Sequence, residues 1–152
     1  MSTSSVFEFV TKSRRFQASP GRVFRAWTSK DDLLTWWQPG RYRTESVRID
    51  LRVGGSYEID MIDPHGRRQR LSGVYIEVEE SRRLVMTWRI EGSPADDGYD
   101  AILTLEFEAD GAGCRLLLKH EKLRPAGLSA FSAGWDGLLP ILANHLEQTG
   151  VP

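Results

Sequence analysis

Few side chains in this sequence could do acid–base chemistry. The three histidines are His65, His120 and His145. His65 lies in the turn motif DPHG, where we expect it to face solvent. His120 ends a stretch in which every second residue is apolar, so its imidazole could offer a cavity a polar or general acid–base group. His145 lies beside an apolar helical stripe, where a lone histidine is more often structural, and we assign no catalytic residue.

Nucleophilic and metal-dependent chemistry have no support in the sequence. The single cysteine, Cys114, is expected to be a small buried side chain at the start of a strand. The sequence contains no Gly-x-Ser-x-Gly motif and no His-x-x-x-His or Cys-x-x-Cys spacing. The pair Gly54-Gly55 is too short for a phosphate loop or a dinucleotide fingerprint. We therefore predict neither a metal nor a cofactor.

Other polar groups are weaker candidates for a site. Tyr57 and Glu121 could reach an inner face or rim, whereas Glu58 and Asp60 alternate with Tyr57 and should point outward. The basic run GRRQR, residues 66–70, could hold an anion but is expected to be a solvated hairpin arm.

Composition bounds the class of protein. The chain has 152 residues, 40 % of them apolar and 27 % charged, with a formal net charge of -1. This predicts one globular domain over residues 1–152, and the lack of positive excess argues against nucleic-acid binding. No signal peptide is visible, and no apolar stretch reaches the roughly 20 residues of a membrane helix. A single cysteine cannot form an internal disulfide, which suits a reducing compartment. We therefore expect a cytoplasmic protein without a membrane partner.

Two short helices are predicted after the first strand. Ser19 suits an N-cap before Pro20 at the first helical position, and Ser29 suits the N-cap of a second helix. The second helix carries Trp36 and Trp37 and stops at a Pro-Gly pair. Because almost nothing links the two helices, they must form a sharp V.

The rest of the chain predicts an antiparallel sheet and one long helix. Apolar and polar residues alternate between polar, glycine-rich turns, and residues 126–149 carry apolar side chains on a single helical face. The expected strands are 6–17, 43–51, 56–62, 67–79, 83–90, 99–109 and 114–120. In the strand 67–79, Tyr75 competes with Val74, Ile76 and Val78 for the inner face, and the sequence does not decide between them.

Several phrases in this order resemble one protein family. These are ASPGRVFRAWTSKDDLLTWWQPG, DLRVGGSYEIDM, SGVYIEVEESRRLVMTW, GCRLLLKHEKL and GWDGLLPILANHLE. Together they resemble the SRPBCC (START-like, birch-pollen-allergen-like) superfamily, in its activator of heat-shock protein 90 ATPase homologue-like group. The resemblance implies an α+β helix-grip fold, in which a curved antiparallel sheet of six to seven strands surrounds a long C-terminal helix.

The resemblance also implies a cavity between the sheet and that helix. Strand alternation and the excess of aromatic residues, Tyr42 among them, select the side chains that would line or cap it, although each could equally fill a solid core. We expect the helical V and its tryptophans to close one mouth. The predicted ligand-binding residues are Phe24, Trp27, Trp36, Trp37, Tyr57, Ile59, Met61, Met86, Trp88, Leu103, Leu105, Phe107, Leu118, His120, Phe131, Trp135 and Leu138.

Three functions remain open at this stage. The leading hypothesis is a small-molecule binding protein, monomeric or homodimeric, that encloses a lipid, a polyketide or another hydrophobic molecule. The second is a cyclase or hydrolase acting on such a ligand, which needs a titrating side chain in the cavity. The third is a chaperone-associated interaction protein, which needs an exposed apolar patch instead.

Overall fold

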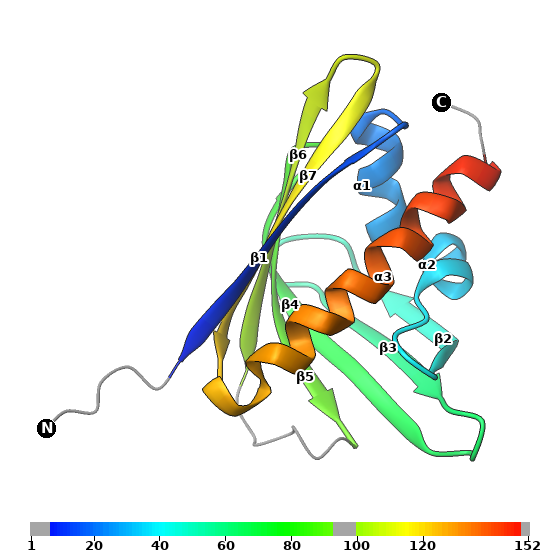
Figure 1. The fold of residues 1–152 in the computed structure, drawn as a ribbon, viewed down its shortest axis with the longest axis vertical. Helices are drawn as coiled ribbons and strands as arrows, with labels where there is room; N and C mark the ends of the chain where they lie inside the picture. Colours follow the sequence, from blue (N-terminus) through cyan, green and yellow to red (C-terminus); the bar gives the residue numbers. More distant parts are fainter. Residues whose placement is uncertain (1–6, 93–99, 150–152) are drawn as a thin grey trace, which may run out of the picture.

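The computed structural model describes residues 7–92 and 100–149 of the chain. It shows seven strands, a pair of short helices after the first strand and a long helix at the end (Figure 1). The elements are β1 Glu8–Phe16, α1 Pro20–Thr28, α2 Lys30–Trp36, β2 Arg43–Ile49, β3 Ser56–Ile62, β4 Arg68–Glu79, β5 Arg83–Glu91, β6 Ala101–Asp110, β7 Gly113–Leu123, the 3-10 turn η1 Pro125–Gly127 and α3 Leu128–Thr149.

The strands form one antiparallel sheet in the order β1-β7-β6-β5-β4-β3-β2. All neighbours except β1 and β7 are consecutive in the chain, as short polar turns predict. Alternation fixes the faces: on β3, Tyr57, Ile59 and Met61 are buried, whereas Glu58 and Asp60 are half-buried on the other side. The predicted helix-grip architecture is confirmed.

The two short helices begin where their caps were expected. The Ser19 hydroxyl accepts the Arg22 N–H at 3.1 Å and begins α1, with Pro20 at the first position. The Ser29 hydroxyl accepts the Asp32 N–H at 3.4 Å and begins α2. Each side chain satisfies an amide that the first helical turn leaves without a partner.

The helix α3 crosses one face of the sheet diagonally, and α1 and α2 lie beside its C-terminal half (Figure 1). Its Trp135, Leu138, Leu142 and Leu146 are buried against the sheet and the short helices. This single apolar face holds the helix in place, because packing moves these apolar side chains out of water, which is energetically favourable.

The faces of β4, which the sequence left open, alternate regularly as far as Tyr75 and change at a bulge that follows it. Leu71 and Tyr75 are buried, whereas Val74 and Ile76 are 42 % exposed. The register between β4 and β5 shifts between Tyr75 and Glu77. On the other edge of β4, towards β3, the backbone of Tyr75 pairs with the β2–β3 turn: its N–H donates to Gly55 O and its carbonyl accepts the Gly54 N–H, both at 2.9 Å.

The element ends differ from the predicted ones by a few residues. The last strand was predicted to stop at residue 120 but continues to Leu123, because β1 remains paired with it as far as Glu8. The long helix begins at Leu128, after a 3-10 turn, rather than at residue 126. Residues 6 and 99, the predicted starts of two strands, lie outside the described part of the chain. None of the described helices is long and apolar enough to cross a membrane.

A buried polar cluster joins the three helices. The Asp32 Oδ1 accepts a hydrogen bond from Arg22 Nη2 at 2.8 Å and lies 2.6 Å from His145 Nε2. All three side chains are at most 12 % exposed. Burial alone raises the pKa of Asp32, but the hydrogen bonds and charges of Arg22 and His145 outweigh it, so the pKa lies below 3.8.

Candidate functional site

An apolar cavity of about 490 Å³ lies between the first half of α3, the ends of β3 to β5 and the segment after α2. We call it the α3 cavity. Its lining combines large buried side chains with a few polar groups, and its composition is typical of small-molecule sites. The lining residues are Trp37, Pro39, Gly40, Arg41, Tyr42, Met61, Asp63, Gln69, Leu71, Trp88, Ile90, Ala130, Phe131, Gly134, Trp135 and Leu138.

The inner wall of the α3 cavity is aromatic. Trp37, Trp88 and Trp135 come from the end of α2, from β5 and from α3, yet their ring centroids are 5.6 to 6.0 Å apart. Each is at most 7 % exposed. Edge-to-face and tilted packing of this kind is favourable and fixes the rings, so the wall exists before any ligand enters.

The polar lining residues Arg41, Asp63 and Gln69 are exposed or half-buried and therefore mark the solvent-facing mouth. The carboxylate of Asp63 is already engaged, because its Oδ1 accepts the N–H groups of His65 at 2.9 Å and Arg67 at 2.8 Å. These bonds outweigh desolvation, and the pKa of Asp63 lies below its usual value. His65 itself is exposed in this turn, as expected.

His120 lies behind the aromatic wall rather than in it. Its ring centroid is 4.7 Å from that of Trp88 and 5.0 Å from that of Phe131, and the residue is 0 % exposed. The indole N–H of Trp135 donates to its Nδ1 at 3.1 Å. Burial lowers the pKa of His120 to about 3, so the ring is neutral near pH 7. Because Nδ1 is an acceptor, the proton resides on Nε2.

The structure brings only some of the predicted ligand-binding residues to the α3 cavity. Trp37, Met61, Trp88, Phe131, Trp135 and Leu138 line it. A second group surrounds a residual void of about 20 Å³ near the centre of the sheet: Trp27, Tyr57, Ile59, Met86 and Leu103, with Trp37 and Trp88 shared. The rest are buried elsewhere in the core: Phe24, Trp36, Leu105, Phe107, Leu118 and His120.

The helical V does not itself close the cavity. Trp36 is 1 % exposed and donates its indole N–H to Ala26 O at 2.8 Å, which ties α2 to α1 inside the core. The segment from Trp37 to Tyr42, which follows α2, forms that wall instead. The expectation that the V and its tryptophans form the lid is therefore corrected in part: Trp36 and the two helices fill space, whereas Trp37 and the loop after it border the cavity.

Sequence reasoning also missed part of the lining. Leu71 and Ile90 follow from stepping by two along β4 and β5, from Tyr75 and Trp88, once the faces are known. Gly134, a helical residue without a side chain, and Gln69 near a strand end carry no comparable signal.

Tyr57 offers no free hydroxyl to a ligand. Its O–H donates to Thr87 O at 2.5 Å, and burial raises its pKa well above 10.0. Cys114 is also buried, and burial raises the pKa of its thiol to about 11. Among the described residues, no group of three or more His, Cys, Asp or Glu side chains could hold a metal ion.

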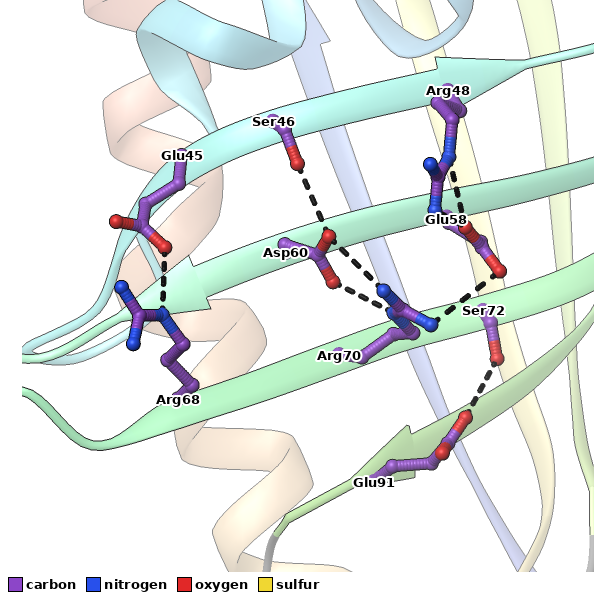
Figure 2. Close-up of polar contacts among 9 residues, drawn as sticks. All are labelled: Glu45, Ser46, Arg48, Glu58, Asp60, Arg68, Arg70, Ser72 and Glu91. Carbon is purple, nitrogen blue, oxygen red and sulfur yellow. Dashed lines mark hydrogen bonds and ion pairs between the residues drawn. The ribbon is translucent and has the colours of Figure 1, made fainter.

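The opposite face of the sheet carries a charged network, which Figure 2 shows across β2, β3, β4 and β5. Arg68 donates to Glu45 at 3.1 Å, and Arg70 donates to Asp60 at 2.7 Å. Two arginines of the GRRQR run are thus paired with carboxylates. Glu58 and Asp60 point outward, as predicted, and belong to this network rather than to the cavity.

The curved antiparallel sheet around a long C-terminal helix places this protein in the class of helix-grip proteins, the SRPBCC superfamily. Residues 17–147 match the family described as Activator of Hsp90 ATPase homolog 1-like protein, and the chain belongs to that family. A comparison with curated proteins finds no match.

Solved structures show the same fold. A protein of Chromobacterium violaceum is 26 % identical, with a TM-score of 0.78 over 90 % of this chain and 94 % of its own. The AHSA1 protein of Silicibacter pomeroyi is also 26 % identical, with a TM-score of 0.77 over 93 % and 99 %. A protein of Nitrosomonas europaea reaches a TM-score of 0.80 at 23 % identity, over 93 % and 95 %.

Proposed function

We propose that this protein binds a small apolar or aromatic molecule in the α3 cavity. The observation that carries the proposal is the cavity itself: about 490 Å³, walled by buried indoles and aliphatic side chains and open at a polar mouth. That volume falls within the roughly 300 to 1,000 Å³ typical of small-molecule sites.

Burial of apolar surface supplies the binding energy. A ligand that buries about 200 Å² of apolar area would gain about 5 kcal/mol, before the costs of immobilising it. The packed rings of Trp37, Trp88 and Trp135 lower those costs, since side chains that are already ordered lose little further entropy.

The same geometry favours binding over turnover. A general acid or base must come within hydrogen-bond distance of its substrate. His120, the titrating group nominated from the sequence, is fully buried behind Trp88 and Phe131 and is not part of the lining. We therefore place binding ahead of a cyclase or hydrolase activity.

Two glycines of α3 provide a matched test. Gly134 lines the α3 cavity, and a Cβ added there meets no atom within 4 Å. Gly137, on the same helix, is equally unobstructed but does not line the cavity. Gly134→Leu should fill the cavity, whereas Gly137→Leu should not, and both should stabilise the helix by about 1 kcal/mol.

The measurement is a titration with the apolar fluorescent probe anilinonaphthalene sulfonate, supported by thermal-shift screening of aromatic compounds. We expect Gly134→Leu to weaken binding at least about tenfold and Gly137→Leu to leave it unchanged. No binding by the parent chain would overturn the proposal. Equal affinity in Gly134→Leu and the parent chain would also overturn it, since the ligand would then sit elsewhere.

A further inference from the structure

We propose that the ligand of the α3 cavity is an amphipathic anion: an apolar molecule that carries a carboxylate at the end facing solvent. This inference rests on the proposed function and specifies the chemical class of the ligand. It starts from the polar mouth of the cavity, where a cationic side chain has no partner and a carboxylate is already hydrogen-bonded.

Arg41 is the cation at the mouth. It is exposed and lines the α3 cavity, and among the described residues no hydrogen bond or ion pair engages its guanidinium. Arginines of the neighbouring strands differ, since Arg48, Arg68 and Arg70 each pair with a carboxylate (Figure 2). Arg41 therefore keeps its N–H donors, which form a planar fork that matches a carboxylate, available to a ligand.

A tight turn fixes the backbone of Arg41 at this position. The Tyr42 N–H donates to Pro39 O at 3.0 Å and closes a turn with Gly40 and Arg41 at its centre. Gly40 has a φ of 60°, which glycine adopts without the steric cost of a side chain. The turn follows shortly after Trp37, whose indole belongs to the aromatic wall. One short segment thus carries both an apolar contact and a cation for the same ligand.

The other polar groups of the mouth are compatible with an anion. Tyr42 and Gln69, both half-buried, each have an O–H or N–H group that can donate. The Asp63 carboxylate also lies at the mouth, but its Oδ1 accepts two backbone N–H groups of its own turn, at 2.8 and 2.9 Å. The charge of Asp63 is therefore partly balanced within the turn, whereas the charge of Arg41 is not.

The physical chemistry of the cavity sets the orientation of such a ligand. A carboxylate loses its hydration if it enters the apolar part, so it stays at the mouth while the apolar body packs against the indoles. At the mouth it can accept hydrogen bonds from the Arg41 guanidinium, and charge-assisted bonds of this kind are stronger than those of a neutral oxygen. A neutral molecule of the same shape gains only the apolar contact.

The matched probes are 2-naphthoate and 2-naphthamide, which share a ring system and differ in charge. Isothermal titration of the full chain near pH 7 should show naphthoate binding about 3- to 5-fold tighter, the effect of a solvent-exposed ion pair. Arg41→Gln should reduce that ratio towards one and leave naphthamide binding unchanged, because it removes the charge and keeps a polar side chain.

Arg43→Gln is the matched control. Arg43 is also exposed and lies two residues further along the chain, but it does not line the cavity, so the ratio should persist. Asp63→Asn tests the sign of the charge, since an asparagine Oδ1 can still accept the N–H groups of the turn. It should raise the ratio, because it removes a negative charge from the mouth. Circular dichroism and thermal unfolding establish that each variant is folded.

The variant Gly134→Leu separates the two proposals. It should weaken the binding of both probes, because both occupy the α3 cavity. Equal affinities of the two probes, an equal loss in Arg41→Gln and Arg43→Gln, or a ratio that falls in Asp63→Asn would overturn the anion preference. The cavity function would still stand if naphthamide binds and Gly134→Leu weakens it. Failure of both probes to bind would overturn both proposals.

Discussion

The Asp32 carboxylate is predicted to hold the three helices together, and its removal tests this directly. Asp32→Ala leaves the Arg22 guanidinium, 8 % exposed, without the carboxylate that it contacts at 2.8 Å, and it deprives His145 of the same oxygen. Breaking a buried ion pair from one side costs about 3 to 5 kcal/mol. That is a large part of the roughly 5 to 15 kcal/mol that stabilises a domain.

Asp31→Ala is the matched control. Asp31 also lies in the first turn of α2, so both variants lose the same interaction with the helix dipole. The Asp31 side chain is exposed, so Asp31→Ala should lower the free energy of unfolding by no more than about 1 kcal/mol. The free energy of unfolding in urea, followed by tryptophan fluorescence, measures both.

The pH dependence gives an independent check. The pKa of Asp32 in the folded chain lies below 3.8, so the unfolded chain takes up the proton first as pH falls. The contribution of Asp32 is therefore complete well above 3.8 and is lost as pH falls through the folded pKa. The stability gap between the parent chain and Asp32→Ala should shrink as pH falls below about 4, where the carboxylate takes up its proton. A cost no larger than that of Asp31→Ala at neutral pH, or a gap that does not shrink below about pH 4, would refute the reasoning.

Two further predictions concern the sheet. Gly73→Ala should destabilise the protein by more than about 3 kcal/mol in thermal unfolding, because its Cβ would lie 2.0 Å from Thr87 O of the paired strand. Gly137→Ala is the control and should not destabilise the protein, because a Cβ at that position meets no atom within 4 Å. Cys114 should resist a thiol-specific disulfide reagent in the native state and react on unfolding, since it is buried and its pKa is raised to about 11. Rapid modification of the native protein would contradict the burial of Cys114.

Local chemistry made much of the fold predictable. The caps at Ser19 and Ser29 depend on amides three residues away, and the burial of Tyr57, Ile59 and Met61 follows from a two-residue period. Both signals are short-range, so the sequence shows them directly. The inner face of β4 was not predictable, because the register shift between Tyr75 and Glu77 breaks the two-residue alternation, so that Tyr75 is buried and Val78 also packs against the core.

The site was harder to predict than the fold. The sequence supplied the aromatic residues, and their number suggested a cavity, but it did not separate Trp37 and Trp88, which line the space, from Trp36, which fills the core. A cavity is the volume that remains after all side chains have packed. No single residue or spacing encodes it.

The sequence alone determined the elements of this protein: an antiparallel sheet, two capped short helices and a long helix with one apolar face. Each of these features depends on residues that are close together in the sequence. Only the tertiary structure decided where the open volume lies, that Trp135 donates to His120, and that Asp32 meets His145 from 113 residues away. Those contacts join distant segments, and packing the whole chain is what brings them together.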